Sequence, residues 1–424
     1  MQVVNTEDLD LYLDQIGRNA KQAAQELSQL DSNVKNQVLE TISQALIEAT
    51  PEIVVANQKD IELAHQAQLS NAAIDRLRLD REGIEKMALG VRNIISLPDP
   101  VGRLIRQWDR PNGLRIFKTA IPIGVIAIIY ESRPNVTVDA ATLCFKSGNA
   151  IILKGGSEAF YSNQVLTEII QRCLKKFKIA LGAVQYLATK NRLVVDKLLT
   201  LSQYIHLVIP RGGASLNKKV AEISRIPVIK HFDGVCHVYI ESDADLEMAR
   251  AIVINAKTQR PGVCNAMECL LVHENLLHSF LPSLIQDLKN KNVVIRADEI
   301  VYQSIPGLEK AQSQDWYKEY LDLILNVKTV QNVEDAIQHI NQYGSGHTDS
   351  IVTQDDEKAK KFLMQVDSAT VLHNASTRFS DGFEFGFGAE MGISTDRLHA
   401  RGPMGLEELT TYKYVIHGNG QIRS

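Results

Sequence analysis

The sequence predicts an α/β fold with two domains, and three observations support this. The chain has 424 residues, which at roughly 100–200 residues per domain corresponds to two or three folding units. Hydrophobic residues make up 45% and charged residues 23%, close to the globular norms of about 45–50% and about 25%. From about residue 125 onward, short apolar runs alternate with stretches of helical periodicity, which is typical of parallel sheets covered by helices.

Charge and segment length exclude several classes of protein. The net charge of −4 gives no broad electrostatic reason to expect binding to nucleic acid. The amino-terminal residues lack a basic region followed by an apolar run, so we expect no secretory signal. The longest apolar run, Ile121 to Tyr130, has the length of a strand, so we expect no membrane span. Five cysteines in such a chain favour reduced thiols, and we expect a cytoplasmic protein.

The first hundred residues predict helices followed by a hairpin. Apolar residues between Leu9 and Leu27 recur at every third or fourth position, as on one face of a helix. Asp31 or Ser32 is suited to cap a second helix, and Pro51 suits the first turn of a third. Residues 104–119, centred on Arg110-Pro-Asn-Gly113, predict a β-hairpin that carries many charges and therefore protrudes.

The remainder predicts two α/β series joined near residues 230–235. We expect a ligand cleft between two such domains. Strands are predicted at residues 125–130, 150–153, 184–187, 205–209 and 228–230, and then at 237–240, 268–272, 293–295, 321–327, 350–353, 370–373 and 409–416. Helices are predicted at residues 135–147, 158–178, 191–201 and 213–223, and then at 243–257, 275–289, 331–342 and 355–366.

Cys264 is the candidate nucleophile. It follows directly on a Pro261-Gly262 bend that ends a predicted helix, and Lys257 and Arg260 lie nearby in sequence. Presentation on an irregular segment in positive surroundings favours the thiolate, which is the reactive form of cysteine. An inert buried thiol is the alternative, and it is the interpretation for Cys269, which lies in an apolar strand pattern.

Two further turns could contact a cofactor. Gly212 and Gly213 follow a strand and precede a helix, which lets backbone N–H groups approach a phosphate; an ordinary tight turn is the alternative. Lys154 ends a buried strand and Ser157 follows it, at the end where ligands bind in α/β sheets; a solvated lysine beside a capping serine is the alternative. No zinc spacing or serine-nucleophile motif occurs, so we expect no metal site.

Together these features resemble the aldehyde dehydrogenase superfamily. The order is a hairpin, the strand Pro122-Ile-Gly-Val125, an asparagine turn, a strand with lysine and glycine, a glycine turn, and then a cysteine in the second domain. The chain resembles one branch more closely, the gamma-glutamyl phosphate reductases, also called glutamate-5-semialdehyde dehydrogenases. Four stretches carry that resemblance: YESRPNVTVD at 130–139, TQRPGVCNA at 258–266, VEDAIQHINQYGSGHTDSI at 333–351 and RGPMGLEELT at 401–410.

The resemblance implies a fold, a domain arrangement and a reaction. The fold would be aldehyde-dehydrogenase-like, with two Rossmann-like α/β domains and a protruding β-hairpin arm for oligomerisation. Residues 1–230 would bind the cofactor, residues 231–380 would carry the nucleophile, and residues 381–424 would return to the cofactor domain and the arm. The reaction would be NADPH-dependent reduction of L-glutamate 5-phosphate (gamma-glutamyl phosphate) to L-glutamate 5-semialdehyde and phosphate through a cysteine thioester, in proline biosynthesis.

Individual roles follow from the same resemblance. Cys264 would form the thioester, and Asn135 would stabilise the oxyanion, although it could also be a mere helix cap. The cofactor-binding residues would be Lys154, Ser157, Gly212 and Gly213. The substrate-binding residues would be Arg133, Arg260, His347, Thr348 and Asp349.

Two departures from the superfamily refine this interpretation. Hydrolytic relatives carry a water-activating glutamate in a Glu-Leu-Gly-Gly run, whereas this chain reads His231-Phe-Asp-Gly234. Without a base to activate water, the sequence favours a reaction in which phosphate leaves over one in which water attacks. His231 is a lesser candidate for proton transfer. NAD-preferring relatives place a glutamate where Ser157 stands, so the small hydroxyl favours NADPH.

Alternatives and partners remain to be tested. A hydrolytic NAD(P)-dependent aldehyde dehydrogenase and a catalytically inactive scaffold paralogue are the competing interpretations. The resemblance implies a homodimer or homotetramer formed through the hairpin at 104–119 and the strand near 409–416. A separate glutamate 5-kinase is a plausible partner, because the chain has no kinase motif of its own.

Overall fold

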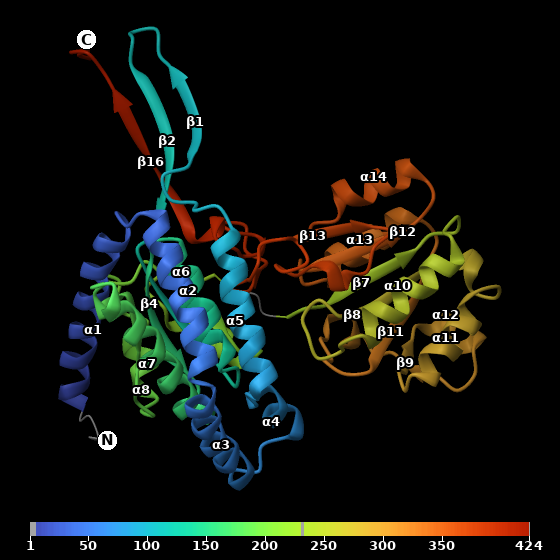
Figure 1. The fold of residues 1–424 in the computed structure, drawn as a ribbon. Coiled ribbons are helices and arrows are strands. Elements are labelled where there is room, and N and C mark those ends of the chain that lie inside the picture. Colours follow the sequence, from blue (N-terminus) through green and yellow to red (C-terminus); the bar gives the residue numbers. More distant parts are fainter. Residues whose placement is uncertain (1–5, 230–232, 424) are drawn as a thin grey trace. The chain divides into compact units, whose positions relative to one another are not determined.

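The structure of the chain is a computed structural model that describes residues 6–229 and 233–423. It divides into two compact units (Figure 1). The first unit consists of Met1–Lys230, Gly386–Gly392 and Met404–Ser424. The second consists of His231–Phe385 and Ile393–Pro403. The chain therefore changes unit close to residue 230 and crosses back within its last forty residues.

The first unit opens with five helices and places four more around a sheet. Two predicted helix starts are present: Asp31 accepts the Asn33 N–H at 2.8 Å, and Pro51 lies in the first turn of the third helix. Such caps satisfy N–H groups that have no partner inside the helix. The helices are α1 (Thr6–Leu27), α2 (Ser32–Glu48), α3 (Thr50–Gln66), α4 (Asn71–Leu77), α5 (Arg81–Ser96), α6 (Asn135–Lys146), α7 (Phe160–Lys176), α8 (Leu193–Leu198) and α9 (Ala214–Ile223).

The sheet of the first unit is parallel and has the order β5-β4-β3-β6. Every residue of the two central strands is buried, which explains their continuous apolar sequence, because helices cover both faces of a parallel sheet. The strands are β3 (Val125–Tyr130), β4 (Ala150–Gly155), β5 (Val184–Tyr186) and β6 (Leu207–Arg211). The strand predicted at 228–230 is reduced to one bridge between Val208 and Val228, because Pro227 directly before it has no N–H to donate, and Lys230 lies outside the described residues.

A three-stranded antiparallel sheet forms the arm of the first unit. Its strands β1 (Leu104–Asp109), β2 (Arg115–Pro122) and β16 (Thr410–His417) have the order β1-β2-β16. Figure 1 shows them standing out from the helices of this unit. The predicted hairpin and terminal strand are thus present, and they pair with each other through β2.

The second unit contains a seven-stranded parallel sheet. Its order is β10-β9-β11-β8-β7-β12-β13, with β7 near the middle. The strands are β7 (Cys236–Ile240), β8 (Met267–His273), β9 (Val294–Ala297), β10 (Glu309–Lys310), β11 (Ile324–Val330), β12 (Thr348–Val352) and β13 (Thr370–His373). The helices are α10 (Leu246–Thr258), α11 (Leu281–Asn290), α12 (Glu299–Ser304), α13 (Val333–Tyr343) and α14 (Asp356–Gln365).

Two hydrophobic clusters lie on the two faces of this sheet. Val238 and Leu270 belong to the cluster that includes α10 and α11, whereas Tyr239 and Leu271 belong to the cluster that includes α13 and α14. Successive residues of a strand point to opposite faces, so the continuous apolar strands of the sequence serve two cores. The short elements β10 and α12 are absent from the sequence prediction, because neither is long enough to establish a period.

The carboxyl-terminal tail differs from the prediction in one respect. Of the residues 381–424 that were predicted to return to the first unit, residues 381–385 and 393–403 belong to the second. Residues 393–403 form the short strands β14 (Ile393–Ser394) and β15 (Gly402–Pro403), and Arg401 pairs there with Asp367 at 2.9 Å. The sequence could not reveal this return to the second unit, because the stretch is rich in glycine and has no helical or strand periodicity.

No helix among the described residues combines the length and the apolar character that crossing a bilayer requires.

Candidate active site

Cys264 lies in the second unit, on the loop between α10 and β8. The other four cysteines are buried, and Cys264 alone is partly exposed. Burial raises the pKa of the Cys144 and Cys236 thiols well above the ordinary value, so both stay protonated. A thiol must be reachable and able to form the thiolate in order to act as a nucleophile. Partial exposure therefore separates Cys264 from the buried thiols.

The loop is fastened to the surrounding backbone. The Cys236 thiol donates to the Cys264 carbonyl oxygen at 3.1 Å, and the Asn265 amide donates to the Ser380 carbonyl at 2.9 Å. Gly234 packs directly against the loop: a Cβ there would stand 2.2 Å from the Cys264 oxygen and 2.7 Å from its Cα. Only glycine permits this approach, so Gly234 lets the backbone pack directly against the loop that carries Cys264.

A buried ion pair closes the base of the same loop. Lys257 at the end of α10 contacts Glu268 in β8 at 2.7 Å, and neither side chain is exposed. The second Glu268 oxygen accepts the Leu321 N–H at 3.1 Å. Burial raises the pKa of Glu268 to about 7 and lowers that of Lys257. Lys257 therefore holds Glu268, and it is not the free positive charge that the sequence suggested beside Cys264.

Two arginines supply positive charge near Cys264. Arg260 is exposed on the loop, and Arg378 is half-buried with its Nε donating to Gln259 at 2.8 Å. Burial lowers the pKa of Arg378, partly offset by acidic neighbours that include the Cys264 thiol. Sequence reasoning identified Arg260 but missed Arg378, because 114 positions separate Arg378 from the cysteine.

Glu319 is a second residue that the sequence did not reveal. Its carboxylate accepts the Gly234 N–H, and its Oε1 lies 2.7 Å from the point that a Gly234 Cβ would occupy. The Cys264 Cα lies at the same distance from that point, so the two atoms are at most 5.4 Å apart (twice 2.7 Å). Burial and then the charge of Asp233 raise the pKa of Glu319. A carboxyl group, that of Glu319, thus stands beside the loop that carries Cys264, although the run His231-Phe-Asp-Gly234 contains no glutamate. His231, the lesser candidate for proton transfer, lies outside the described residues.

The predicted substrate contacts on β12 and directly before it are enclosed. Thr348 and Asp349 on β12, and His347 just before it, are fully buried because β12 lies between β7 and β13. Asp349 accepts both the backbone N–H and the ring Nδ1 of His237 at 2.8 Å, and the Ser368 hydroxyl. The contacts of Asp349 hold β12 to β7, and contact of these three side chains with an amino-acid substrate stays a prediction.

The remaining predicted residues meet at one edge of the first unit's sheet. Tyr130 at the end of β3 pairs with Gly155 of β4 and with Arg211 of β6, so the segments that follow these strands are neighbours. In α/β sheets this carboxyl edge is where ligands bind. The residues that follow or end the strands are Arg133, Asn135, Lys154, Ser157, Gly212 and Gly213.

Two of these residues already have partners within the first unit. Gly213, at the amino end of α9, donates its N–H to the Glu131 carboxylate at 3.0 Å, so an anionic oxygen already occupies that helix terminus. Lys154 is largely buried and donates to the Gly155 carbonyl at 2.6 Å; burial lowers its pKa. Ser157 is exposed. The Gly213 N–H and the Lys154 ammonium group are thus already engaged, and binding of a cofactor phosphate by these residues stays a prediction.

Asn135 and Arg133 occupy the turn after β3. Asn135 is the first residue of α6, its amide donates to Asp139 at 3.0 Å, and Pro134 holds the cap position. The helix-cap alternative for Asn135 is therefore wrong, because its side chain reaches along the helix and not back to the first N–H groups. Arg133 is half-buried on the same turn.

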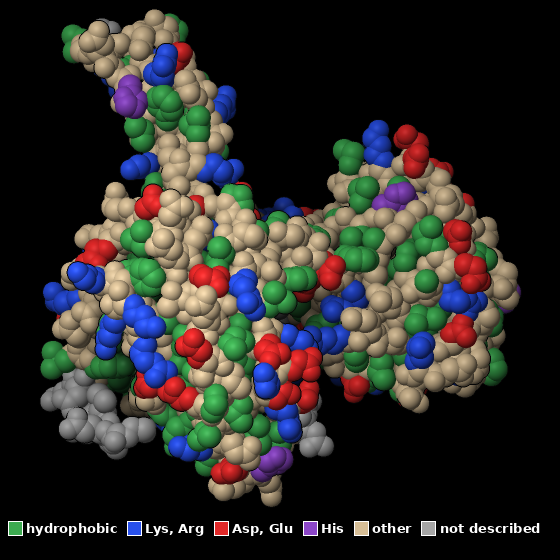
Figure 2. All heavy atoms as spheres, viewed as in Figure 1, with side chains coloured by type: hydrophobic (Ala, Val, Ile, Leu, Met, Phe, Trp, Pro, Cys, Tyr) green, Lys and Arg blue, Asp and Glu red, His purple; other side chains and the backbone are tan. Residues whose placement is uncertain are grey.

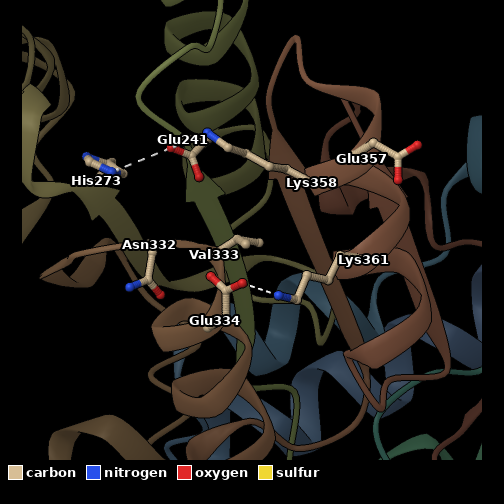
Figure 3. A pocket seen from close by; sticks show the side chains of 8 residues that line it. All are labelled: Glu241, His273, Asn332, Val333, Glu334, Glu357, Lys358 and Lys361. Atoms are coloured by element: carbon tan, nitrogen blue, oxygen red, sulfur yellow. Dashed lines mark hydrogen bonds and ion pairs between the residues drawn. The ribbon is translucent and has the colours of Figure 1, made fainter.

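A cavity of about 370 Å³ lies elsewhere in the second unit, at the carboxyl ends of β7 and β8 (Figure 3). Its Glu241 contacts Lys358 at 3.2 Å and His273 at 3.6 Å, and Glu334 pairs with Lys361. Cys264 precedes β8 and therefore lies at the opposite, amino end of the strands. The cavity holds none of the predicted site residues, and most of its charges are paired with each other.

Comparison with known proteins identifies the class. The aldehyde dehydrogenase family model matches residues 9–306 and 307–415. An acetylating aldehyde dehydrogenase from Geobacillus thermoglucosidasius shares the fold, with a TM-score of 0.69 at 19% identity over 98% of each chain. The chain belongs to the aldehyde dehydrogenase family, whose members use NAD or NADP.

More similar relatives lie in a single branch of that family. Gamma-glutamyl phosphate reductase of Moorella thermoacetica is 53% identical over 96% of this chain and 97% of its own length. That of Carboxydothermus hydrogenoformans is 53% identical over 96% and 98%. The crystal structure of gamma-glutamyl phosphate reductase from Thermotoga maritima has a TM-score of 0.95 at 44% identity, covering 97% of this chain and 100% of that one. The resemblance and the fold class drawn from the sequence are thereby confirmed.

Proposed function

We propose that this chain reduces gamma-glutamyl phosphate to L-glutamate 5-semialdehyde and phosphate with NADPH, as a cytoplasmic enzyme of proline biosynthesis. The observation that carries the proposal is a partly exposed thiol, Cys264, in a chain half-identical over nearly its full length to reductases of that name. Arg260 and Arg378 beside the thiol suit a substrate that carries a phosphate.

The Cys264 thiolate would be acylated by the substrate and then released unchanged. The Cys264 thiolate attacks the acyl carbon, the bond from that carbon to the phosphate oxygen breaks, and inorganic phosphate leaves with the electron pair. Bound NADPH supplies the hydride that reduces the resulting thioester. The oxyanion of the resulting tetrahedral adduct re-forms the carbonyl as the carbon–sulfur bond breaks, which releases the aldehyde and restores the thiolate. The proton that the overall reaction consumes goes to the phosphate.

Charge on the acyl oxygen must be stabilised while both tetrahedral species exist. The backbone N–H of Cys264 and the side-chain amide of Asn135 are the proposed donors, the latter by resemblance to the family. Loss of one such donor typically costs about 2.7–4 kcal/mol of transition-state stabilisation. The Asn135 amide is held by Asp139, which fixes the direction in which its remaining N–H points.

Preference for NADPH over NADH rests on the edge after β4. Ser157 leaves room for a 2′-phosphate, and Lys154 would pair with it. Glu158, the next acidic residue, accepts the Ser132 N–H at 2.6 Å and the Ser132 hydroxyl at 2.9 Å. That carboxylate is therefore committed to the turn after β3 and does not compete for a ribose. Steady-state KM values for both cofactors test the preference, and a clear advantage for NADH would refute it.

Phosphate-dependent oxidation of glutamate semialdehyde, the reverse reaction, tests the function. We expect NADP reduction that requires added phosphate. A hydrolytic aldehyde dehydrogenase would turn over without phosphate, and a scaffold would show no rate. A Ser70→Ala variant, in which only an exposed helix cap is lost, controls for handling of the protein. Association with a separate glutamate 5-kinase is a further proposal, which co-purification of the two proteins would test.

A further inference from the structure

Three side chains with metal-binding atoms meet inside the second unit. His237 lies on β7, Cys269 on β8 and His339 on α13. All three are buried, and one ligand atom from each lies within 4.8 Å of the others. None of them has a role in the proposed reaction.

The strand register explains why these groups meet. His237 on β7 is directly opposite Cys269 on β8 and directly opposite Asp349 on β12. Partners in a parallel ladder point to the same face, so the side chains of Cys269, His237 and Asp349 form one row across the sheet. Cys269 belongs to the cluster on the face that α13 covers, and α13 brings His339 over the row.

His237 is oriented as a metal-binding histidine is. Its Nδ1 is hydrogen-bonded to Asp349 at 2.8 Å, and Asp349 is held in turn by Ser368. Histidine ligands usually donate their second ring N–H to a carboxylate, which fixes the ring and its tautomer. The other nitrogen, Nε2, is fully buried and has no hydrogen-bond partner among the described residues. A buried polar atom left unpaired is destabilising, so this nitrogen points to a missing partner.

The other two groups are fixed at a suitable distance. The Cys269 sulfur and the His339 Nε2 are 3.8 Å apart. Ring contacts with Trp316 and Tyr343, at centroid distances of 5.4 and 4.6 Å, hold the His339 ring. Zinc lies about 2.3 Å from sulfur and about 2.0–2.1 Å from nitrogen, so tetrahedral ligands stand roughly 3.4–3.6 Å apart. A shift of a few tenths of an ångström would bring this pair to that separation.

We propose that His237, Cys269 and His339 bind one thiophilic divalent cation, with zinc as the type, as a structural site of the second unit. The cation displaces two protons to solvent, one from the Cys269 thiol and one from the Nε2 of His237, because metal ligands bind deprotonated. Its two positive charges are then balanced by the Cys269 thiolate and the Asp349 carboxylate, as a buried site requires. The ion ties α13 to β7 and β8 through its three protein ligands.

Metal content of the full-length chain tests this site. The protein is unfolded, refolded with zinc, dialysed and measured for zinc per chain, because a buried site fills during folding. We expect one zinc per chain and a higher Tm than after refolding with a chelator. The same stoichiometry is expected in Cys264→Ala, which removes the exposed thiol, and in Cys173→Ala, which removes another buried one. Cys269→Val should lose the ion.

Refolding the protein with cobalt in place of zinc gives a second test, which does not depend on whether Cys269→Val folds. Wild-type protein and Cys264→Ala should both show the near-ultraviolet charge-transfer band of a cobalt–thiolate bond. Substoichiometric zinc in refolded wild-type protein, or a cobalt spectrum without that band, overturns the proposal and leaves a purely hydrogen-bonded core. Equal zinc in folded Cys269→Val overturns it as well.

Discussion

Cys264 differs from the other four cysteines in both exposure and surroundings. It alone is partly exposed, and its loop is held by Cys236, Gly234 and Asn265. Cys264→Ala should leave folding intact, because the side chain fills no core position, and should lower kcat by about a thousandfold or more. Circular dichroism and the phosphate-dependent assay measure the two effects; appreciable residual activity would exclude Cys264 as the nucleophile.

Glu319 makes a second residue-level prediction. Its carboxylate holds the Gly234 N–H beside the nucleophile loop, so Glu319→Gln should lower kcat by ~10-fold or more and alter the pH profile, with little change in Tm. The matched control is Glu309→Gln, which removes an exposed carboxylate that pairs with Arg296. If both variants behave alike, Glu319 has no specific part in the reaction.

Asp139 predicts a pH dependence of stability. Burial raises its pKa from 3.8 to about 6, against the hydrogen bond from Asn135. The folded chain therefore keeps a proton that the unfolded chain releases, and the stability this confers below about pH 4 is lost as the pH rises to about 6. Asp139→Asn cannot titrate, so its free energy of unfolding should fall less across this range. Urea unfolding at several pH values checks this, and parallel curves for both proteins would contradict it.

At the scale of elements, the loop between α10 and β8 depends on a buried ion pair at its base. Lys257→Met leaves Glu268 without its partner in a fully buried place, which should lower the free energy of unfolding by ~3 kcal/mol. Replacing both partners, as in Lys257→Met with Glu268→Leu, should recover much of that loss, although the Leu321 N–H also loses its acceptor. Denaturant unfolding measures each variant; a double variant no better than the single one would contradict this account.

At the scale of the whole molecule, the arm makes the prediction about assembly. Tyr412, Tyr414 and Ile416 on β16 are 47%, 55% and 56% exposed, and Leu104 and Ile105 on β1 are similarly open. Figure 2 shows hydrophobic side chains on the arm above the body of the first unit. Such apolar exposure on a protruding sheet is typical of an interaction surface, and β16 is an edge strand available for pairing.

We therefore predict a homodimer or homotetramer held through the arm. Light scattering at micromolar concentration should give a multiple of the 47.2 kDa chain mass. Tyr414→Asp together with Ile416→Asp should shift the protein toward the monomer, whereas Tyr317→Asp, on an exposed tyrosine outside the arm, should not. A monomeric wild-type protein would refute the role of the arm.

The sequence by itself determined the α/β class and most element positions, and it singled out Cys264 as the candidate nucleophile. Alternation of apolar runs with helical periods is a local property, and it located the strand at 125–130 and the strand at 370–373 with the bounds that the structure has. Cys264 could be identified because its Pro-Gly bend lies beside it in the chain, and the family motifs are contiguous stretches.

Only the tertiary structure decided which distant groups meet. Glu319 and Arg378 reach the nucleophile loop from far along the chain, and Cys269 and His339 are 70 positions apart. It also showed that Lys257 is already paired and that His347, Thr348 and Asp349 are enclosed. The physical reason is that strand order and register, which depend on packing across the sheet, set these distances and burials, and no local spacing encodes them.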